Sequence, residues 1–283
     1  MVERKETLYS GWGQTFWNLS LLAMVKTAYQ RIEIYKSDSH GNILFLDGAV
    51  QITELDEFVY QEMMTHVPMI CHGQAKDILI VGAGDGGILR HVLQHKGVES
   101  ATMVEIDAEV IRLSKRFLPQ IGGNAWADPR AHVVVADAIQ YVATATAASF
   151  DVILIDSTDP DGVGEVLFTE EFYHQCARVL RPDGILVNQG GVPFMQPSEL
   201  REVTLRQRKV FDHVSGYVVA VPTYVGGVML LGIASKKPLN KTMTNAEVLI
   251  RASASGITGV SRYWNPEIHT ASFALPTYIG LLM

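Results

Sequence analysis

A glycine-rich loop and a carboxylate that follows it are the first residues whose types and spacing could do chemistry. The segment Val81-Gly-Ala-Gly-Asp-Gly-Gly87 ends the apolar run 77–81, which is typical of a strand buried on both faces. Glycines at such a junction let the backbone turn sharply and let a nucleotide come close to it. Glu105 lies 18 residues beyond Gly87, where a carboxylate can accept hydrogen bonds from both ribose hydroxyls. These residues predict a nucleoside site.

The aspartate inside this loop bears on which nucleoside is bound. Asp85 lies where the pyrophosphate of a dinucleotide would lie, and a carboxylate there would repel the phosphates. This argues against a dehydrogenase and favours a ligand with a positive charge. Common methyltransferases that use S-adenosylmethionine carry an acidic residue two positions before the first glycine, whereas this chain has Ile80. Both enzyme classes stay open at this point, each with one residue against it.

Asp137 is a third candidate for contact with the nucleoside. It follows the apolar run 132–136 and is placed to meet an adenine amino group. A side chain at that position can equally well cap the N-terminus of the following helix. The sequence leaves these two roles open.

Two further aspartates follow an apolar run in the segment Asp156-Ser-Thr-Asp-Pro160. Ligands of open α/β sheets bind beyond the carboxyl ends of the strands, which places Asp156 and Asp159 at the site; the alternative is that they cap a turn. With Asp85 they favour a polyvalent cation, and Asp156 could act as a general base. Gly162 and Gly164 could form a mobile lid. The ligand spacing of a transition-metal site is absent from the sequence, so no metal is expected.

The composition limits the possible ligands and the location. Of 283 residues 48% are apolar and 19% charged, and 23 Lys and Arg against 30 Asp and Glu give a formal charge of −7. This acidic balance argues against a nucleic-acid partner. Two cysteines are too few for a disulfide scaffold or a zinc site. The N-terminus resembles no signal peptide, and the apolar stretch 16–25 is too short to span a bilayer, so we expect a cytoplasmic protein without membrane contact.

The elements that must position these residues fall into two regions. Residues 1–70 are expected to form a small β domain, with strands at 30–35, 42–46 and 49–53. Asp47-Gly48 between the last two strands predicts a hairpin. From Asp56 onward, apolar residues at helical spacing predict a helix. The boundary with the second region is expected near residues 68–76.

The second region, residues 71–283, alternates apolar runs with helix-like segments. The runs that we expect to be buried strands are 77–81, 101–106, 132–136, 150–155 and 184–188, with helices at 108–117 and 171–180 among those between them. This alternation predicts a doubly wound parallel sheet and therefore an α/β fold. Two late apolar runs, 217–221 and 228–234, predict a closing antiparallel hairpin.

Several of these motifs resemble those of the polyamine aminopropyltransferases, and within that family those of the spermidine synthases. The motifs are Leu46-Asp-Gly-Ala-Val-Gln51, Asp56-Glu-Phe-Val-Tyr-Gln-Glu-Met63, the glycine loop 81–87, Met103-Val-Glu-Ile-Asp107, Asp156-Ser-Thr-Asp-Pro160, Pro222-Thr-Tyr224 and Arg262-Tyr-Trp-Asn-Pro-Glu-Ile-His269. They follow the family's order over nearly the whole chain.

The resemblance implies a fold, a reaction and an assembly. The fold is a small N-terminal β domain followed by a Rossmann-like domain of the kind found in S-adenosylmethionine-dependent methyltransferases. The reaction is transfer of the 3-aminopropyl group of decarboxylated S-adenosylmethionine to putrescine, which gives spermidine and 5′-methylthioadenosine in polyamine biosynthesis. No cofactor is implied, because the sulfonium is already an activated leaving group. Members of the family are usually homodimers or homotetramers.

The resemblance also implies the roles of individual residues. Asp156 would be the catalytic base, which is needed because an alkylamine with a pKa near ~10.4 must lose a proton before it attacks. The donor would contact Gln30, Gln51, Gln61, Asp85, Glu105, Asp137, Ala138 and Val163. The amine would contact Tyr60, Asp85, Asp156, Asp159 and Tyr224.

A few residues depart from the family's pattern. Val163 stands where the family usually has a proline that would stiffen the lid, Ala138 replaces a common glycine, and Ala83 replaces the middle residue of a frequent Gly-Gly-Gly. The stretch 17–25 also departs from the usual N-terminal pattern. Two alternatives therefore accompany the aminopropyltransferase hypothesis: a methyltransferase that uses S-adenosylmethionine, and a weakly active homologue that binds polyamines or nucleosides.

Overall fold

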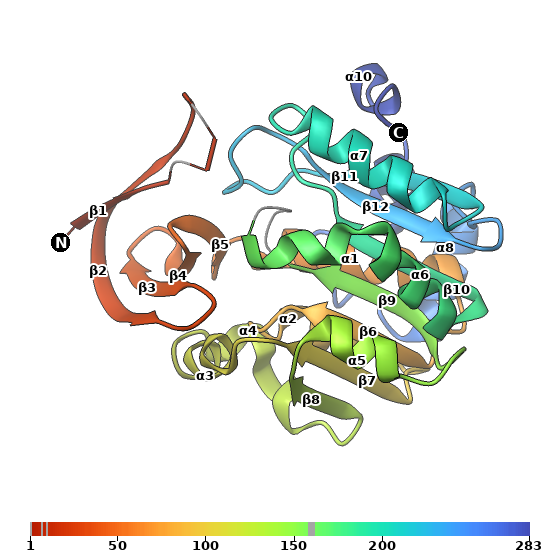
Figure 1. Cartoon of the computed structure of the whole chain (residues 1–283), viewed down its shortest axis with the longest axis horizontal. Helices are drawn as coiled ribbons and strands as arrows, with labels where there is room; N and C mark the ends of the chain where they lie inside the picture. Colours follow the sequence, from red (N-terminus) through yellow and green to blue (C-terminus); the bar gives the residue numbers. More distant parts are fainter. Residues whose placement is uncertain (1, 7, 10, 158–161) are drawn as a thin grey trace.

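Two β-sheets organise the chain, and most of the helices lie against the second of them (Figure 1). The computed structural model describes residues 2–6, 8–9, 11–157 and 162–283 of the 283-residue chain. The first sheet has five strands and comes from the N-terminal region, and the second has seven strands. This confirms the predicted α/β class, with a small β region that precedes a doubly wound region.

The N-terminal sheet is antiparallel, and its strands follow one another in chain order. They are β1 (Val2–Lys5), β2 (Thr15–Lys26), β3 (Arg31–Ser37), β4 (Gly41–Leu46) and β5 (Ala49–Thr53). The predicted hairpin joins β4 to β5. Asp47 and Gly48 both have positive φ angles, 48° and 90°, as a two-residue turn between twisted strands requires. The apolar stretch 16–25 lies within β2, a strand that the sequence analysis did not predict.

Helix α1 (Glu57–His72) connects the two sheets, and it begins directly after Asp56, where the start of a helix was predicted. Its apolar side chains, among them Val59 and Met63, are buried in one cluster with Ile78, Ile80 and Leu154 of the seven-stranded sheet. The helix therefore packs with the second sheet, although it precedes residue 70. The division into domains 1–70 and 71–283 stays a prediction.

The seven-stranded sheet has the order β11-β12-β10-β9-β6-β7-β8. Its strands are β6 (Asp77–Gly82), β7 (Ser100–Glu105), β8 (Ala131–Val135), β9 (Phe150–Asp156), β10 (Leu180–Gln189), β11 (His213–Val219) and β12 (Met229–Ser235). The pairs from β8 through β10 are parallel, and β12 pairs antiparallel with both β10 and β11. The parallel core and the closing hairpin are thus confirmed.

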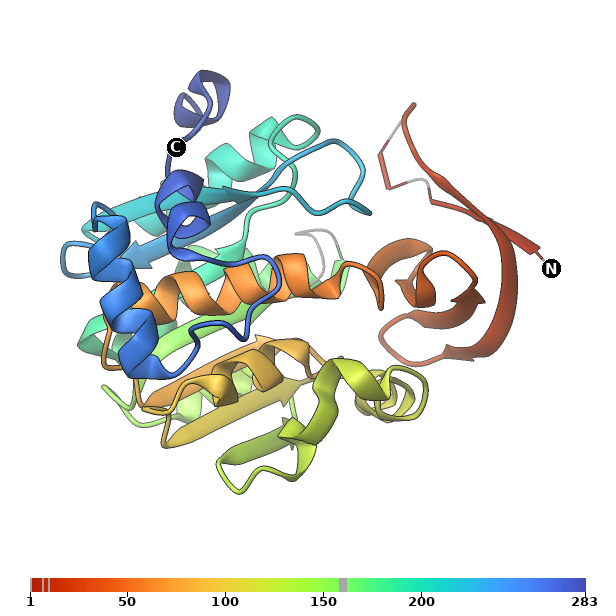
Figure 2. The ribbon, with the colours of Figure 1, turned by 180° about the vertical axis from the view of Figure 1, so that it is seen from behind.

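Helices lie on both faces of this sheet, with α5, α6 and α7 on one face and α1, α2 and α8 on the other (Figures 1 and 2). The remaining bounds are α2 (Gly87–Gln94), α3 (Ala108–Phe117), α4 (Pro119–Gly122), η1 (Gly123–Ala127), α5 (Ala138–Thr144), η2 (Gly162–Phe168), α6 (Glu170–Val179), α7 (Pro197–Arg208), α8 (Asn245–Ser255), α9 (Pro266–Ser272) and α10 (Thr277–Gly280). Among the described residues, no helix is both long enough and apolar enough to cross a membrane.

A buried carboxylate fastens the C-terminal segment to α1. Glu62 is only 1% exposed, and its two oxygens accept hydrogen bonds of 2.8 Å from the backbone N–H groups of Arg262, Tyr263 and Trp264. A charged acceptor makes each of these bonds stronger than a neutral one. The segment that carries Trp264 is thereby held against α1.

We expect Glu62→Gln to lower the free energy of unfolding by about 3 kcal/mol, because an amide replaces a buried charged acceptor that serves three backbone donors. Thermal and urea unfolding would measure the change. Glu99→Gln is the matched control, since Glu99 pairs with Lys76 at the exposed surface, where such pairs contribute about 0–1 kcal/mol. Equal losses in the two variants would contradict the role of Glu62 as a buried anchor.

Candidate active site

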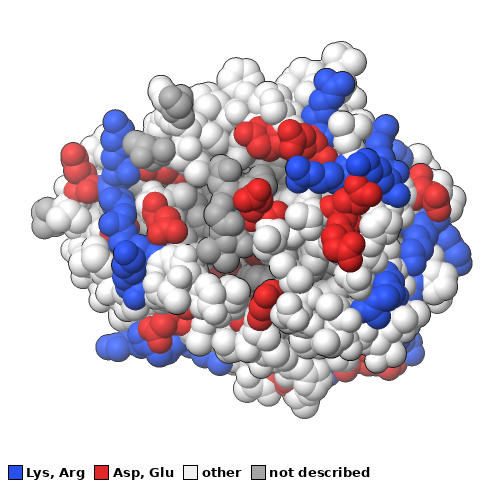
Figure 3. Space-filling view, viewed as in Figure 1, with Lys and Arg blue, Asp and Glu red and all other residues white. Residues whose placement is uncertain are grey.

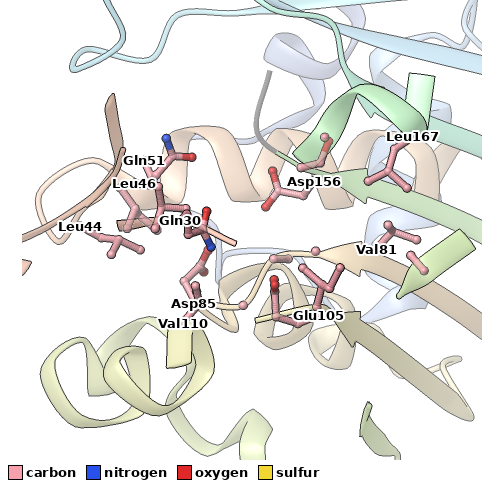
Figure 4. A pocket seen from close by; sticks show the side chains of 18 of the residues that line it. Gln30, Leu44, Leu46, Gln51, Val81, Asp85, Glu105, Val110, Asp156 and Leu167 are labelled. Atoms are coloured by element: carbon pink, nitrogen blue, oxygen red, sulfur yellow. The ribbon is translucent and has the colours of Figure 1, made fainter. Parts of the chain in front are cut away.

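A pocket of about 400 Å³ lies at the carboxyl ends of β6, β7 and β9. The N-terminal sheet and the start of α1 form the opposite wall, and Figure 4 shows Gln30, Leu44, Leu46 and Gln51 facing the strand ends from there. The pocket is lined by all the predicted site residues whose side chains the structure describes: Gln30, Gln51, Tyr60, Gln61, Asp85, Glu105, Asp137, Ala138, Asp156 and Tyr224. Its size is that of a small-molecule site.

The glycine loop follows β6 as predicted. Its first glycine is required because strands β6 and β9 approach each other closely there. Gly82 pairs with Asp156 across the parallel strands β6 and β9 and has a φ of 81°. A Cβ at Gly82 would collide with the backbone oxygen of Asp156. Ala83, which replaces a glycine of the family pattern, adopts a left-handed φ of 58°, a conformation that is costly for a residue with a Cβ.

Asp85 lies in this loop, and the protein's own hydrogen bonds fix the position of its carboxylate. Its Oδ1 atom accepts hydrogen bonds of 2.7 Å from Gln61 Nε2 and from the backbone N–H of Gly87. The space that Gln61 occupies is open because residue 87 has no Cβ, which would overlap the Gln61 amide. Burial, and then the negative charge of Asp156, raise the pKa of Asp85 to about 7.

Glu105 ends strand β7, where the sequence analysis placed it, and is buried. Its Oε1 atom accepts a 2.9 Å hydrogen bond from the backbone N–H of Asp107. Burial raises the pKa of Glu105 to about 7. A hydrogen-bond donor from a ligand, such as a hydroxyl, would stabilise the charged form of this carboxylate.

Asp156 ends strand β9 on the opposite side of the glycine loop and is half-buried. The Tyr60 hydroxyl donates a 2.7 Å hydrogen bond to Asp156 Oδ1. Burial raises the pKa of Asp156 to about 6, against the lowering effect of the Tyr60 hydrogen bond. Burial, and then the charge of this carboxylate, raise the pKa of Tyr60 well above its usual value, so this phenol stays a donor. In Figure 4 the carboxylates of Asp156 and Glu105 face a common space.

Two aromatic rings and two glutamines complete the polar lining. Tyr224 donates a 2.7 Å hydrogen bond from its hydroxyl to the carbonyl oxygen of Gln51, and its ring lies 6.0 Å from the ring of Tyr60. Gln30 donates a 3.3 Å hydrogen bond from Nε2 to Asp107 Oδ2. The tyrosines and glutamines thus join the N-terminal sheet to the strand ends around one pocket.

Asp137 serves as a helix cap and also lines the pocket. Its Oδ1 atom accepts a 2.8 Å hydrogen bond from the backbone N–H of Ile139 at the start of α5, which is the capping role left open above. Ala138, the first residue of that helix, is buried beside it. The structure does not test two predicted site residues: Asp159, and the side chain of Val163, are outside the described residues.

A second pocket, of about 350 Å³, shares Gln51, Tyr60, Asp156 and Tyr224 with the first. It extends from Asp156 towards the N-terminal segment, and its further lining includes Glu6, Tyr9, Gln189, Gln196 and Met229. None of these residues was predicted from the sequence to line a site. Asp156 therefore stands between two connected cavities, one beside Glu105 and the glycine loop and one beside the N-terminal segment.

The electrostatic character of the pocket is acidic. Among the described residues that line the first pocket there are carboxylates but no Lys, Arg or His. Figure 3 shows acidic side chains near the centre of this face, while most Lys and Arg side chains lie farther out. In the described part of the chain no cluster of three or more His, Cys, Asp or Glu residues could hold a metal ion. The arrangement suits an organic cation and can accept a proton at Asp156.

Comparison with known protein families identifies the chain. A model described as the spermine/spermidine synthase domain matches residues 57–245, and a model described as the spermidine synthase tetramerisation domain matches residues 19–54. Relatives named polyamine aminopropyltransferase, from Pseudomonas syringae pv. tomato and Escherichia fergusonii, are 46% and 44% identical to it. The chain aligns over 99% of its length with each and covers 96% and 97% of them.

Solved structures agree with these sequence comparisons. A crystal structure of spermidine synthase in complex with the transition-state analogue AdoDATO superposes with a TM-score of 0.89 at 34% identity, covering 99% of this chain and 94% of that one. The spermidine synthase of Thermotoga maritima superposes with a TM-score of 0.87 at 34% identity, covering 100% and 94%. The chain is a member of the spermine/spermidine synthase family and an aminopropyltransferase of polyamine biosynthesis.

Proposed function

We propose that the chain transfers the 3-aminopropyl group of decarboxylated S-adenosylmethionine to putrescine, which gives spermidine and 5′-methylthioadenosine. The observation that carries the proposal is the set of three carboxylates, Asp85, Glu105 and Asp156, on a pocket whose described lining has no basic side chain. The donor carries a sulfonium and an ammonium, and putrescine carries two ammonium groups at neutral pH. Relatives named polyamine aminopropyltransferase and the spermidine synthase bound to AdoDATO support this assignment.

The donor would occupy the first pocket. Glu105 would accept hydrogen bonds from the ribose hydroxyls, and the pocket wall at Asp137 and Ala138 would hold the adenine. Asp85 would pair with the ammonium of the aminopropyl group. The side chains that would line the nucleoside part of the pocket are Gln30, Gln51 and Gln61. Val163 would also contact the donor.

The acceptor would enter through the second pocket and present one nitrogen beside Asp156. Tyr60, Asp159 and Tyr224 would position the diamine, and Asp156 would take up the proton that the ammonium must lose. The free amine then attacks the methylene carbon of the aminopropyl group that bears the sulfonium. A C–N bond forms, the C–S bond breaks, and its electron pair goes to sulfur, which leaves as the neutral thioether. One proton is released overall.

No cofactor enters this proposal, because the sulfonium is itself the leaving group and the amine is the nucleophile. Alignment of the amine nitrogen with the methylene carbon is what the pocket must supply, and holding reactants in line contributes a large share of the rate.

A panel of acceptors tests the proposed substrate. With decarboxylated S-adenosylmethionine as donor, putrescine should give the highest kcat/KM among putrescine, cadaverine, agmatine and spermidine, measured by release of methylthioadenosine. A higher value for another amine would reject putrescine as the preferred acceptor. Methyl transfer from S-adenosylmethionine would instead support a methyltransferase, and tight binding without turnover would support a polyamine-binding homologue.

Protonation of the pocket carboxylates leads to a calorimetric prediction. Near pH 6.5 a share of Asp85, with its pKa of about 7, is protonated, and a bound ammonium lowers this pKa. Binding of decarboxylated S-adenosylmethionine should therefore release protons near pH 6.5, and the release should vanish near pH 8.5, where the carboxylate is already charged. Titrations in two buffers of different ionisation enthalpy would count these protons.

Methylthioadenosine is the control for this titration because it lacks both positive charges. It should release fewer protons than the donor near pH 6.5. Equal proton release by the two ligands, or a release that does not depend on pH, would contradict the pairing of Asp85 with the ammonium.

We also propose that the protein forms homodimers or homotetramers through the N-terminal sheet. Strand β2 exposes several large apolar side chains, namely Trp17, Leu21 and Met24, of which Trp17 is 67% exposed. Contiguous exposed apolar side chains are typical of protein interfaces. The family model for a tetramerisation domain begins within this strand. The cytoplasmic location stays a prediction.

A further inference from the structure

A buried aspartate at the start of α1 joins the end of β5, which lies just before it in the chain, to Thr223, which is distant in sequence. Asp56 is 4% exposed. Its Oδ1 atom accepts a 2.6 Å hydrogen bond from the hydroxyl of Thr53, the last residue of β5. Its Oδ2 atom accepts two hydrogen bonds from Thr223, one from the backbone N–H at 2.9 Å and one from the hydroxyl at 2.7 Å. We call Thr53, Asp56 and Thr223 the threonine latch.

The geometry of Asp56 differs from that of an ordinary helix cap. It occupies the N-cap position of α1, yet its side chain makes no capping hydrogen bond to that helix. An N-cap aspartate usually satisfies a free N–H of its own helix and thereby stabilises that helix. Here both oxygens of the carboxylate instead bind threonines from other segments.

The N-terminal segment holds Thr223 from its other side. Gln14 donates a hydrogen bond of 2.5 Å from Nε2 to the carbonyl oxygen of Thr223 and another of 2.6 Å to Glu6 Oε2. Glu6 Oε1 in turn accepts a 2.8 Å hydrogen bond from the backbone N–H of Val50 in β5. The N–H, the hydroxyl and the carbonyl oxygen of Thr223 are therefore all engaged, and both sets of bonds lead back to the N-terminal sheet.

The residue that this latch places is Tyr224. Its hydroxyl donates to Gln51 of β5, and its ring packs near Tyr60, whose own hydroxyl donates to Asp156. Tyr224 lines both pockets, whereas the described lining of neither includes Thr223. A displacement of Thr223 would therefore reach the amine side of the site through Tyr224, without removing an atom that touches a ligand.

We propose that the threonine latch positions Tyr224 and thereby sets the affinity of the enzyme for its amine acceptor. This inference rests on the proposed function, since it takes the cavity beside Tyr224 and Asp156 as the acceptor site. Thr223 and Asp56 act as positioning residues in this account. Asp56 also lines the first pocket, whereas the proposed ribose and adenine contacts, Glu105 and Asp137, belong to β7 and to the cap of α5.

Thr223→Val tests the proposal because it removes the hydroxyl and leaves the shape and the backbone N–H. We expect KM for putrescine to rise roughly five- to tenfold, with kcat changed less than threefold. A displaced Tyr224 ring would weaken binding of the amine more than it would slow the chemical step. The affinity for methylthioadenosine should stay within about twofold. Thr223→Ser, which keeps the hydroxyl, should restore KM to near its original value.

Thr204→Val is the matched control, since Thr204 is equally buried, on α7, and lines neither pocket in the described part of the chain. It should leave both KM and methylthioadenosine affinity unchanged. Gln14→Met removes the bond to Thr223 from the other side and should raise KM for putrescine as well. It serves as the second variant should Thr223→Val fail to fold.

Binding of putrescine to the methylthioadenosine-loaded protein, measured by calorimetry, separates this inference from the proposed function. Weaker amine binding in Thr223→Val, with methylthioadenosine affinity retained, supports the latch even where turnover is low. Unchanged amine affinity in both Thr223→Val and Gln14→Met would overturn the inference about the latch while leaving the proposed function intact. An unaltered protein that neither binds nor converts putrescine would overturn both.

Discussion

Replacing Asp156 with asparagine is expected to lower the rate of aminopropyl transfer by about 10²–10⁴-fold, which is the usual contribution of a general base. The carboxylate lies at the end of β9 between two connected cavities, where an amine and a donor can meet. Asparagine keeps the oxygen that accepts the Tyr60 hydrogen bond but can neither take up a proton nor carry a charge. Steady-state rates with saturating donor and acceptor would measure the loss.

Two controls test whether a loss of rate in Asp156→Asn comes from a general disturbance of the protein. Affinity for methylthioadenosine should be nearly unchanged in Asp156→Asn, because Glu105, on a different strand, is the proposed ribose contact. Asp212→Asn is the matched control, since Asp212 is exposed and lies outside the described lining of both cavities, and it should have the original rate. Near-normal turnover of Asp156→Asn at pH 7 would exclude Asp156 as the base.

The second large effect is expected at Asp85 and concerns the choice of donor. Decarboxylated S-adenosylmethionine ends in an ammonium, whereas S-adenosylmethionine carries a carboxylate on the same carbon, which would approach Asp85 and Asp156. Two unit charges about 4 Å apart interact by roughly 4 kcal/mol at an effective dielectric constant near 20. Even a third of that energy corresponds to about tenfold in affinity. The decarboxylated donor should therefore bind more than tenfold tighter.

Asp85→Asn should reduce this discrimination, mainly by weakening binding of the decarboxylated donor. The amide oxygen can still accept the hydrogen bonds of Gln61 and Gly87, so the loop keeps its shape and methylthioadenosine affinity should not change. Calorimetry with the three nucleosides would test this. Equal affinities for the two donors in the unaltered protein, or an unchanged ratio in the variant, would show that Asp85 does not select the donor.

The parts of the fold with strong local signals could be predicted from the sequence. Helix α3 has the predicted bounds, because Asp107 caps it by accepting from the Glu109 N–H, and its first turn is acidic. The Asp47-Gly48 turn has the two positive φ angles that its residue types favour. The loop after β6 and the ends of β7 and β9 converge because parallel strands present their carboxyl ends on one edge.

Other elements were not predicted, either because their sequence pattern is irregular or because a local signal in the sequence was not used. Strand β2 lacks a clean alternation of buried and exposed residues, since its register shifts between Leu21 and Ala23 and Asn18 has a φ of 57°. Helix α8 has a capping box formed by Thr244 and Glu247, a signal that the sequence analysis did not exploit. Asp137 could not be assigned to one role because one carboxylate both caps α5 and faces the pocket.

The second cavity and the threonine latch depend on tertiary structure alone. Glu6 and Gln189 are far apart in the sequence and line one cavity only because the N-terminal segment reaches the carboxyl end of β10. In the same way, Thr223 contacts Asp56 across the junction of the two sheets. No local spacing of residues encodes such contacts, so a single sequence does not reveal them.

The most direct test of the proposed reaction is a single-turnover experiment analysed by mass spectrometry. The protein is mixed with equal concentrations of S-adenosylmethionine and decarboxylated S-adenosylmethionine, together with putrescine labelled with ¹⁵N. We expect labelled spermidine and methylthioadenosine in a one-to-one ratio, with S-adenosylmethionine unconsumed. Methylated product with S-adenosylhomocysteine, or methylthioadenosine without labelled spermidine, would contradict transfer of the aminopropyl group to putrescine.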